Sequence, residues 1–303
     1  MKNRVYIIIA FLLAGAFCSC QDHFDINHLN EETQLLVYCF PSTTDSTDIQ
    51  VSATIPLAGT GEMPKNIRVH CYVNEKEESV RFLRNDDSDE WDKFIYRLSN
   101  IPKEGDEIKI SIESENLGTA SCTTKIPLSP TIDSIYARPI QIDGESYQQL
   151  CVNISNSPNQ NSYYAVKVLG SWDKEHWGKC EINTYSEPLL NNYIMGIPVF
   201  DEDRDFYDDF YIFDNSSFLN DSTYTLHLNI EENRGYYQVQ LYHITHSMYE
   251  FFKTINDHTN NEFGKYGLSF IHPTYTNIVN GCGVMGGYAL NTQIYENGEN
   301  NKK

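Results

Sequence analysis

Basic residues are scarce in this sequence. Of its 303 residues, 22 are Lys or Arg and 42 are Asp or Glu, which gives a formal net charge of −20. An acidic excess of this size repels the phosphate backbone of nucleic acids and the anionic surface of membranes. We therefore expect no nucleic-acid partner, and we interpret most of the carboxylates as a solvated surface.

Sequence signatures of catalysis are also missing. The chain has no C-x-x-C pair, no G-x-S-x-G elbow, no P-loop and no H-E-x-x-H zinc motif, and no cysteine stands beside an obvious histidine. Redox, hydrolytic, nucleotide-dependent and zinc-dependent enzymes are recognised by such patterns. We expect a protein without catalytic residues, cofactor or metal. A pair of carboxylates at glycosidase distance stays open as an alternative, because acidic residues are plentiful.

No apolar run is long enough to span a membrane as a helix, which takes about 20 residues. The longest apolar run extends from Val5 to Cys18 and follows Lys2 and Arg4. A short apolar run behind a basic start has the proportions of a secretory signal peptide. We assign residues 1–19 to this signal, whose removal takes away two basic residues and leaves a charge of about −22.

The signal ends in FCSC, with the small residue Ser19 directly before Cys20. This arrangement resembles the lipobox of bacterial lipoproteins, in which a cysteine receives lipid and becomes the mature N-terminus. We predict lipidation of Cys20; Cys18 competes, but the bulky Phe17 precedes it, and a plain secreted protein is the alternative. Two or more acyl chains anchor a protein stably. Residues 20–32 would form the lipidated tether, whose QDHFD start resembles export signals of surface-exposed lipoproteins in Bacteroidota.

Six further cysteines follow the lipobox: Cys39, Cys71, Cys122, Cys151, Cys180 and Cys282. An exported protein can form disulfides, but six thiols in a chain of this length are not a dense framework, and their pairing is left open. Three of them, Cys39, Cys71 and Cys122, fall within predicted strands. We expect these three to be small buried hydrophobic residues.

Long stretches of helical periodicity are nearly absent, and short alternating runs bounded by turn residues take their place. Residues 33–129 contain seven such runs: TQLLVYCF, DIQVSATIPL, NIRVHCYVN, SVRFLR, KFIYRLS, EIKISIES and TASCTTKIPL. Seven short strands in about a hundred residues indicate an immunoglobulin-like β-sandwich. In NIRVHCYVN, one face carries the apolar set Ile67, Val69, Cys71 and Val73.

A second, larger β-rich domain is predicted over residues 130–296, and residues 297–303 form a disordered tail. Pro130 marks the boundary, because one alternating run stops there and another begins. One short helix is expected near 248–258, where Met248, Phe251, Phe252 and Ile255 share a face at helical spacing. Ser247 and Glu250 have the spacing of a capping box at its start.

The string GCGVMG, Gly281 to Gly286, matches the G-x-G-x-x-G pattern of dinucleotide sites. That pattern must follow the first strand of a βαβ unit and open a helix. Here only seventeen residues follow Gly286, and the next segment, YALNTQIY, alternates like a strand. We reject a cofactor site and expect the glycines to mark bulges or a close backbone approach at a sheet edge.

Two further strings invite a metal. The acidic run from Asp201 to Asp209 starts with calcium-like spacing, but Phe206 and Ile212 stand where an EF-hand needs Gly and Glu. A looser calcium site in 201–209 stays open beside a solvated acidic loop. His243 and His246 form H-x-x-H at a strand-to-helix junction, where we expect His243 to be a satisfied core histidine.

The best candidates for ligand contact are two tryptophans. Trp172 and Trp177 stand five residues apart in SWDKEHW, near a predicted loop. Exposed indole rings at a loop can stack against a ligand such as a sugar. The sequence does not identify that ligand.

Three stretches together resemble a family of Bacteroidota lipoproteins, the domain-of-unknown-function 4249 family. They are the lipobox with the following QLLVYCF strand, the THSMYEFFKTINDHTNN helix, and the closing TNIVNGCGVMGGYAL. The family's signature falls on Asn277, Gly281, Gly283, Gly286, Gly287 and Tyr288. Thr276, Val284 and Met285 depart mildly from the usual residues. No catalytic residues are established for the family, so the resemblance implies none here.

The resemblance implies an accessory protein of a TonB-dependent outer-membrane receptor. We therefore expect a lipid-anchored, surface-exposed outer-membrane protein that partners such a transporter in nutrient capture without catalysis. Anchoring on the periplasmic face is the alternative location. A surface hydrolase of glycans or peptides, and an adhesin or fimbrial-type lipoprotein, are the alternative functions; a missing or swapped strand in the first domain would favour the adhesin.

Overall fold

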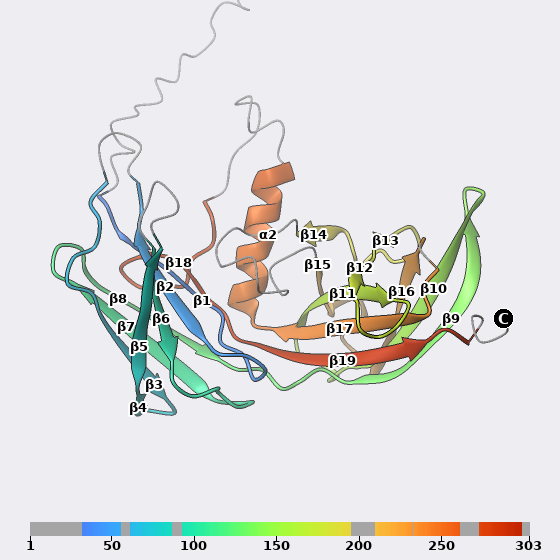
Figure 1. Ribbon diagram of the computed structural model, residues 1–303, viewed down its shortest axis with the longest axis horizontal. Coiled ribbons are helices and arrows are strands. Elements are labelled where there is room, and N and C mark those ends of the chain that lie inside the picture. Colours follow the sequence, from blue (N-terminus) through green and yellow to red (C-terminus); the bar gives the residue numbers. More distant parts are fainter. Residues whose placement is uncertain are drawn as a thin grey trace, which may run out of the picture.

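The computed structural model describes residues 32–55, 61–86, 93–194, 210–231, 233–260 and 273–298 (Figure 1). Strands dominate these residues, and α2 (His246–Asn260) is the only α-helix among them. The mainly β fold predicted from the alternating runs is confirmed. No helix in the described part of the chain combines the length and the apolar character needed to cross a membrane.

The first half of the chain forms a sandwich of two antiparallel sheets. Its strands are β1 (Leu35–Cys39), β2 (Asp48–Ala53), β3 (Arg68–Val73), β4 (Lys76–Glu78), β5 (Val80–Asp86), β6 (Lys93–Leu98), β7 (Glu107–Ser114) and β8 (Gly118–Lys125). The order β1-β2-β6-β5 faces the order β4-β3-β7-β8. This is the immunoglobulin arrangement of A-B-E-D against C-F-G, with β4 as an added edge strand. All seven predicted runs form strands; only the short, charged β4 was missed.

The core of this first sandwich follows from strict alternation. In β7, Ile108, Ile110 and Ile112 are buried while the residues between them face outward. Cys71 and Cys122 lie in the same core, as expected for small hydrophobic residues. Burial, helped by the nearby Glu78 carboxylate, raises the pKa of the Cys71 thiol to about 12. No disulfide joins any two of the six cysteines among the described residues.

A strand from the end of the chain extends this first sandwich. β18 (Cys282–Met285) pairs in parallel with β1 and forms the edge of its sheet. The segment falls within the predicted C-terminal domain, 130–296, but in the structure it pairs with a strand of the N-terminal sandwich. The reason is the path of the chain, since residues 276–285 return to the first sandwich before β19 begins. A long-range parallel pairing of this kind leaves no local sequence signal.

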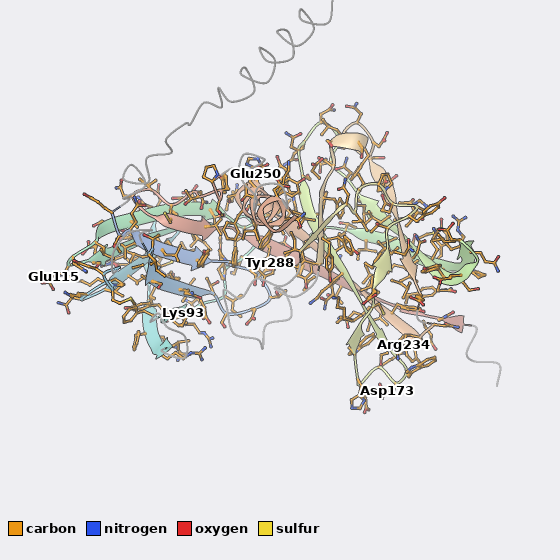
Figure 2. The ribbon with its side chains drawn as sticks, turned by 90° about the horizontal axis from the view of Figure 1, so that it is seen from above. Lys93, Glu115, Asp173, Arg234, Glu250 and Tyr288 are labelled. Carbon is orange, nitrogen blue, oxygen red and sulfur yellow. The ribbon has the colours of Figure 1, made fainter. Side chains whose placement is uncertain are left out.

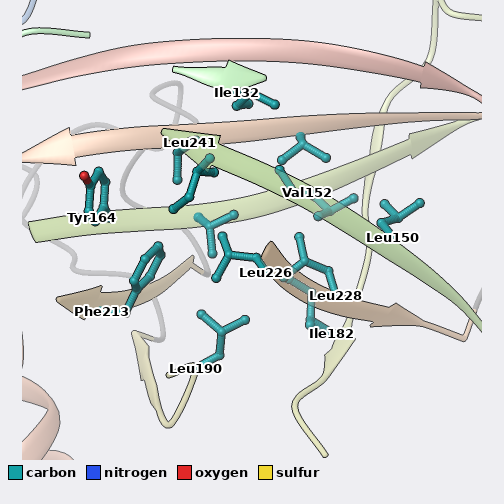
Figure 3. Packing of buried hydrophobic residues seen from close by; sticks show 14 of the residues in the cluster. Ile132, Leu150, Val152, Tyr164, Ile182, Leu190, Phe213, Leu226, Leu228 and Leu241 are labelled. Carbon is teal, nitrogen blue, oxygen red and sulfur yellow. The ribbon is translucent and has the colours of Figure 1, made fainter. Parts of the chain in front are cut away.

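The second sandwich also has two sheets. One contains β13 (Ile182–Asn183), β16 (Thr223–Ile230), β10 (Glu145–Ser155) and β9 (Ile132–Ile142) in that order. The other runs β14 (Asn192–Ile194), β15 (Phe210–Asp214), β11 (Tyr163–Ser171), β17 (Tyr236–Ile244) and β19 (Tyr288–Glu296), with the short β12 (Gly178–Lys179) paired to β11. A short 3-10 helix, η3 (Ser216–Phe218), precedes β16. Leucine, valine and isoleucine side chains from both sheets fill the space between them (Figure 3).

Helix α2 stands between the two sandwiches (Figure 1). Its buried residues Met248, Phe251 and Phe252 belong to a cluster that also holds Phe40, which follows β1, and Phe210 of β15. The Phe40 and Phe252 rings stack with their centroids 5.9 Å apart. The helix thus covers the outer face of one sheet of the second sandwich and joins that sheet to the first sandwich.

The predicted helix is confirmed, but its predicted cap is wrong. The carbonyl of Thr245 accepts the first helical bond, from the N–H of Tyr249, so Thr245 stands at the N-cap and Ser247 lies inside the first turn. The Ser247 hydroxyl donates instead to the carbonyl of Met285, at 3.2 Å. Tertiary contact with β18 has replaced the local capping box.

Candidate functional site

Trp172 and Trp177 lie together on the loop that joins β11 to β12. This loop projects from the second sandwich, with Asp173 at its tip and Arg234 nearer the body (Figure 2). The Trp172 side chain is 58% exposed. Trp177 is partly buried, and its indole N–H donates to the carbonyl of Lys174 at 3.1 Å. The two predicted contact residues are therefore not equivalent, and only Trp172 offers a largely open ring.

Asp173 holds the projecting loop in one conformation. Its carboxylate accepts the backbone N–H groups of Glu175 and His176, both at 2.9 Å, and lies 2.8 Å from Nδ1 of His176. Ser171 donates its hydroxyl to the same carboxylate at 3.0 Å. These hydrogen bonds, led by the N–H of His176, lower the pKa of Asp173. The loop is thus organised by its own hydrogen bonds.

Cationic side chains and aromatic rings surround this loop. The Arg234 guanidinium lies 5.8 Å from the Trp172 ring centroid. The Lys174 ammonium lies 4.3 Å above the Tyr236 ring and 3.6 Å from the Glu296 carboxylate. We call the group Trp172, Asp173, Lys174, Arg234 and Tyr236 the hairpin tip. Its combination of Trp, Tyr and Arg is typical of the residues that dominate protein–protein binding energy.

The glycines of the signature segment serve packing. A Cβ at Gly283, whose φ is +97°, would overlap the carbonyl oxygen of Val37 on the neighbouring β1. A Cβ at Gly281 would lie 2.8 Å from the Leu35 carbonyl oxygen, and one at Gly286 would lie 2.5 Å from Cβ of Met248. The expected close backbone approach at a sheet edge is confirmed. Gly287 is similarly crowded by Ile126, at 3.1 Å.

Asn277 and Tyr288 of the signature segment also make contacts within the chain. The Asn277 side chain donates to the carbonyl of Met285 at 2.8 Å and accepts its N–H at 2.9 Å, so it imitates a paired strand. Tyr288 is 6% exposed and packs edge-on against Tyr242, with centroids 5.9 Å apart. These contacts give the signature residues a structural role in the return of the chain to the first sandwich.

One arrangement escaped the sequence reading. Cys151 of β10 stands directly opposite His227 of β16, and the Glu187 carboxylate lies 3.6 Å from Nδ1 of His227. A thiol, an imidazole and a carboxylate are the components of a nucleophilic site. However, Cys151 is fully buried, and its sulfur is directed at the amide oxygen of Gln149, 3.7 Å away. A substrate cannot reach this thiol in the described conformation. We therefore assign Cys151, His227 and Glu187 a structural role.

The proximity of Cys151 and His227 could not be predicted because it depends on the register between β10 and β16. Cys151 and His227 lie in runs that were both predicted as strands, but their pairing depends on which strands are neighbours and in what register. A shift of one residue would have placed the two side chains on opposite faces.

His243 and His246 line a groove at the junction of the two sandwiches. Nδ1 of His243 donates to the carbonyl of Leu128 at 2.8 Å, and the ring stacks on Tyr164 with centroids 5.3 Å apart. Burial lowers the pKa of His243, which favours the neutral ring. The expected satisfied histidine is what the structure contains, although it is half-buried. Nε2 of His246 lies 3.4 Å from the Glu250 carboxylate.

Two predicted sites lie outside the described residues. They are the lipidation site, Cys20, and the acidic run 201–209 with its open calcium question. Among the residues that the structure describes, no three His, Cys, Asp or Glu side chains gather in a group that could hold a metal ion.

The fold is that of a β-protein with two sandwiches, of which the first has the immunoglobulin strand order and gains an edge strand from the end of the chain. The chain belongs to the family described as "Domain of unknown function (DUF4249)", whose model matches residues 21–294. No curated protein matches the chain.

Two solved structures show a weak similarity to the chain. A mutated variant of three immunoglobulin domains of titin shares 12% identity over 69% of this chain and 60% of that chain, with a TM-score of 0.21. A structure of manganese lipoxygenase of Gaeumannomyces graminis with part of zonadhesin of Komagataella pastoris shares 10% identity, over 70% of this chain and 88% of that chain, with a TM-score of 0.19. Neither similarity carries an inference about function.

Proposed function

We propose that the protein is a lipid-anchored accessory protein of the outer membrane that docks on a TonB-dependent transporter and helps it capture a nutrient, without catalysing a reaction. In this proposal Cys20 bears the lipid, and the protein faces the cell surface. The signal run, the FCSC junction and the family membership support the anchor and the location. The hairpin tip is the observation that carries the docking.

The physical argument for the hairpin tip is preorganisation. An exposed loop normally loses conformational entropy when a partner immobilises it. Here the Asp173 carboxylate already fixes the loop with four hydrogen bonds, so little further entropy is lost. Trp172 is then presented, 58% exposed, beside a guanidinium. Burying such a ring at the centre of an interface contributes on the order of 2 kcal/mol or more.

The structure gives less support to the adhesin alternative. A missing or swapped strand in the first sandwich would have favoured it. Instead, β18 of the same chain pairs with β1 and occupies that sheet edge.

The test is recovery of the receptor with the protein. The tagged chain is extracted from its native membranes in mild detergent, captured, and its partners are identified by mass spectrometry. We expect a TonB-dependent receptor to be recovered with the wild type and at least tenfold less with Trp172→Ala. The control Phe82→Ala removes another exposed aromatic ring, on the first sandwich, and should leave recovery unchanged. Recovery of the wild type with no receptor would overturn the proposal.

The anchor has its own test. Cys20→Ser should release the protein from membranes and abolish labelling with a radioactive or alkyne-bearing fatty acid. Persistent labelling of this variant would identify Cys18 as the modified residue.

A further inference from the structure

The hydrogen bonds that fix the loop of the hairpin tip do not hold its most exposed ring. The Asp173 carboxylate accepts the backbone N–H groups of Glu175 and His176 and the hydroxyl of Ser171. None of these bonds involves the Trp172 side chain. A ring that is 58% exposed can still change its side-chain torsions on a fixed backbone. The contacts beneath the ring therefore decide how it is presented to a partner.

The Trp172 ring rests on the segment that leads into β17. The Arg234 guanidinium lies 5.8 Å from the ring centroid. A Cβ on Gly235 would lie 3.8 Å from Cε3 of the ring and 3.5 Å from the Trp172 carbonyl oxygen. Both contacts come from three residues, Asn233, Arg234 and Gly235, which we call the supporting turn. Figure 2 shows Arg234 at the foot of the projecting loop whose tip is Asp173.

A glycine of β11 leaves room for the stem of Arg234. A Cβ at Gly170 would lie only 2.8 Å from Cγ of Arg234 and 2.7 Å from the Cys180 sulfur. Gly170 stands directly opposite Tyr237 in the pairing of β11 with β17. The Arg234 stem therefore packs closely over the end of β11, and its guanidinium extends to the ring.

The supporting turn lies just outside the strand ladders on both sides. The last pair of β11 with β17 joins Ser171 to Tyr236, and the last pair of β17 with β19 joins Tyr236 to Glu296. Residues beyond the end of a ladder lose the regular backbone partners of the sheet. The supporting turn therefore needs other hydrogen bonds to keep a single conformation.

Asn297, the residue after β19, supplies these bonds. Its backbone N–H donates to the Gly235 carbonyl at 2.9 Å. Its side-chain amide donates to the side-chain oxygen of Asn233 at 2.8 Å and to the Arg234 carbonyl at 3.3 Å. Asn297 thus bonds all three residues of the supporting turn. It is only 3% exposed, so water does not compete for these bonds.

The core completes the hold on Arg234. Its backbone N–H donates to the hydroxyl of Tyr237 at 2.9 Å, and Tyr237 is fully buried among the core residues of the second sandwich. Tyr237 contributes to the core whatever the supporting turn does. Both side-chain bonds of Asn297, by contrast, go to the supporting turn. Asn297 is therefore the residue whose side chain is dedicated to the seat of the ring.

We propose that Asn297 is a positioning residue for docking, because it holds the supporting turn and the turn holds the Trp172 ring in the orientation that a partner binds. The inference rests on the proposed docking at the hairpin tip and names a residue that sets its strength. A ring that is already held loses less conformational entropy when a partner buries it. Asn297 itself is buried, so it acts on docking through the ring and without touching the partner.

The experiment observes the ring directly in the full-length protein. Fluorotryptophan is incorporated in place of tryptophan, and fluorine NMR then gives one signal for each of the three tryptophans. The variant Trp172→Phe identifies the signal of Trp172. In Asn297→Ala this signal should become narrower, because the ring gains motion, and should move towards the position of free fluorotryptophan.

Two further variants make the result specific. Asn297→Asp keeps the size of the side chain but removes its N–H donors, so it should change the Trp172 signal in the same way. Asn291→Ala is the matched control, because it removes another amide of β19 that donates to a carbonyl, that of Pro130, at 2.9 Å. It should leave the signal unchanged. Circular dichroism melting confirms that each variant is folded.

Recovery of the receptor is measured with the same variants. Asn297→Ala should recover about fivefold less receptor than the wild type, whereas Asn291→Ala should recover as much. An unchanged Trp172 signal in both Asn297 variants, or a changed signal with unchanged recovery, would overturn the inference. Recovery of no receptor with the wild type would overturn the proposed function instead. The Trp172 signal would then still decide whether Asn297 holds the ring.

Discussion

One sheet of the first sandwich, β4-β3-β7-β8, differs from the sheets of the second sandwich in how its outer face is covered. In the first, β7 and β8 alternate buried and outward residues, and the outer face carries charged pairs such as Arg68 and Glu113, 3.5 Å apart and open to solvent. In the second, α2 covers one outer face, and the loop after β13 covers part of the other, where Ser186 bonds to Gln149 and Asn229. Six successive residues of β10, from Tyr147 to Val152, are buried.

Burial on both faces makes individual polar contacts matter. Glu187 is 1% exposed on the covering loop, and its carboxylate accepts the Tyr224 hydroxyl and the N–H of His227, both at 2.9 Å. Gln149 and Asn229 are also buried on this face and bonded to each other at 2.8 Å. If a polar group is removed from this buried face, its former partners stay buried and cannot bond to water instead. On the β3–β7 face of the first sandwich the outward residues are exposed, so little stability is lost when one of them changes, because solvent replaces the contact.

The largest effect is expected where the two halves meet. Gly283→Ala should lower the free energy of unfolding by about 3 kcal/mol, because the positive φ and the overlap with the Val37 carbonyl both oppose a side chain. Gly144→Ala, at φ +89° with open space around it, is the matched control and should cost only about 1 kcal/mol. Urea unfolding measures both; equal losses would show that backbone conformation alone, and not contact with β1, requires glycine.

A middle-sized effect tests the difference between the outer faces directly. Glu187→Gln should destabilise the protein by about 1–3 kcal/mol, because the amide cannot accept all the bonds that the carboxylate accepts. Glu113→Gln, in the exposed pair of the first sandwich, should change stability by less than about 0.5 kcal/mol. Thermal melting of the two variants measures both stability changes. Similar losses of stability would contradict the difference between the buried and the exposed outer face.

The smallest effect concerns pH at the junction. Burial lowers the pKa of His243 in the fold below its ordinary value of 6.5, so the unfolded chain binds the proton first as pH falls. Stability from this residue is complete above about pH 6.5 and declines as pH falls from there towards the folded pKa. His243→Asn retains a donor near the Leu128 carbonyl and cannot titrate, so its stability should fall less than that of the wild type between pH 7.5 and 5.5. Parallel pH dependence in both proteins would exclude His243 as the source.

Local patterns predicted most of the elements. The seven runs of the first sandwich, the faces of β3 and the helix around Met248 all depend on spacing within a few residues, and all were confirmed. The short strand β4 pairs with its neighbour β3 but has only three charged residues, Lys76–Glu78, and so no alternating apolar pattern. The cap at Thr245 and the parallel pairing of β18 depend on contacts between distant segments. The groove escaped prediction for the same reason, because its walls are ordinary Ser, Asn and Pro residues brought together only by the fold. Trp172 and Trp177 were correctly placed near a loop, but only the structure distinguishes the open ring from the bonded one.

The return of β18 to β1 also sets the order in which the molecule can be completed. When the chain is synthesised from its N-terminus, strands β1 to β8 of the first sandwich are complete at Lys125. The strand that borders β1, β18, begins only at Cys282. Until then the β1 edge offers unpaired backbone groups to any other strand. A gene cut at Pro130 would therefore yield a first half with an open edge instead of an independent module. The two halves are expected to be inherited and lost as one unit.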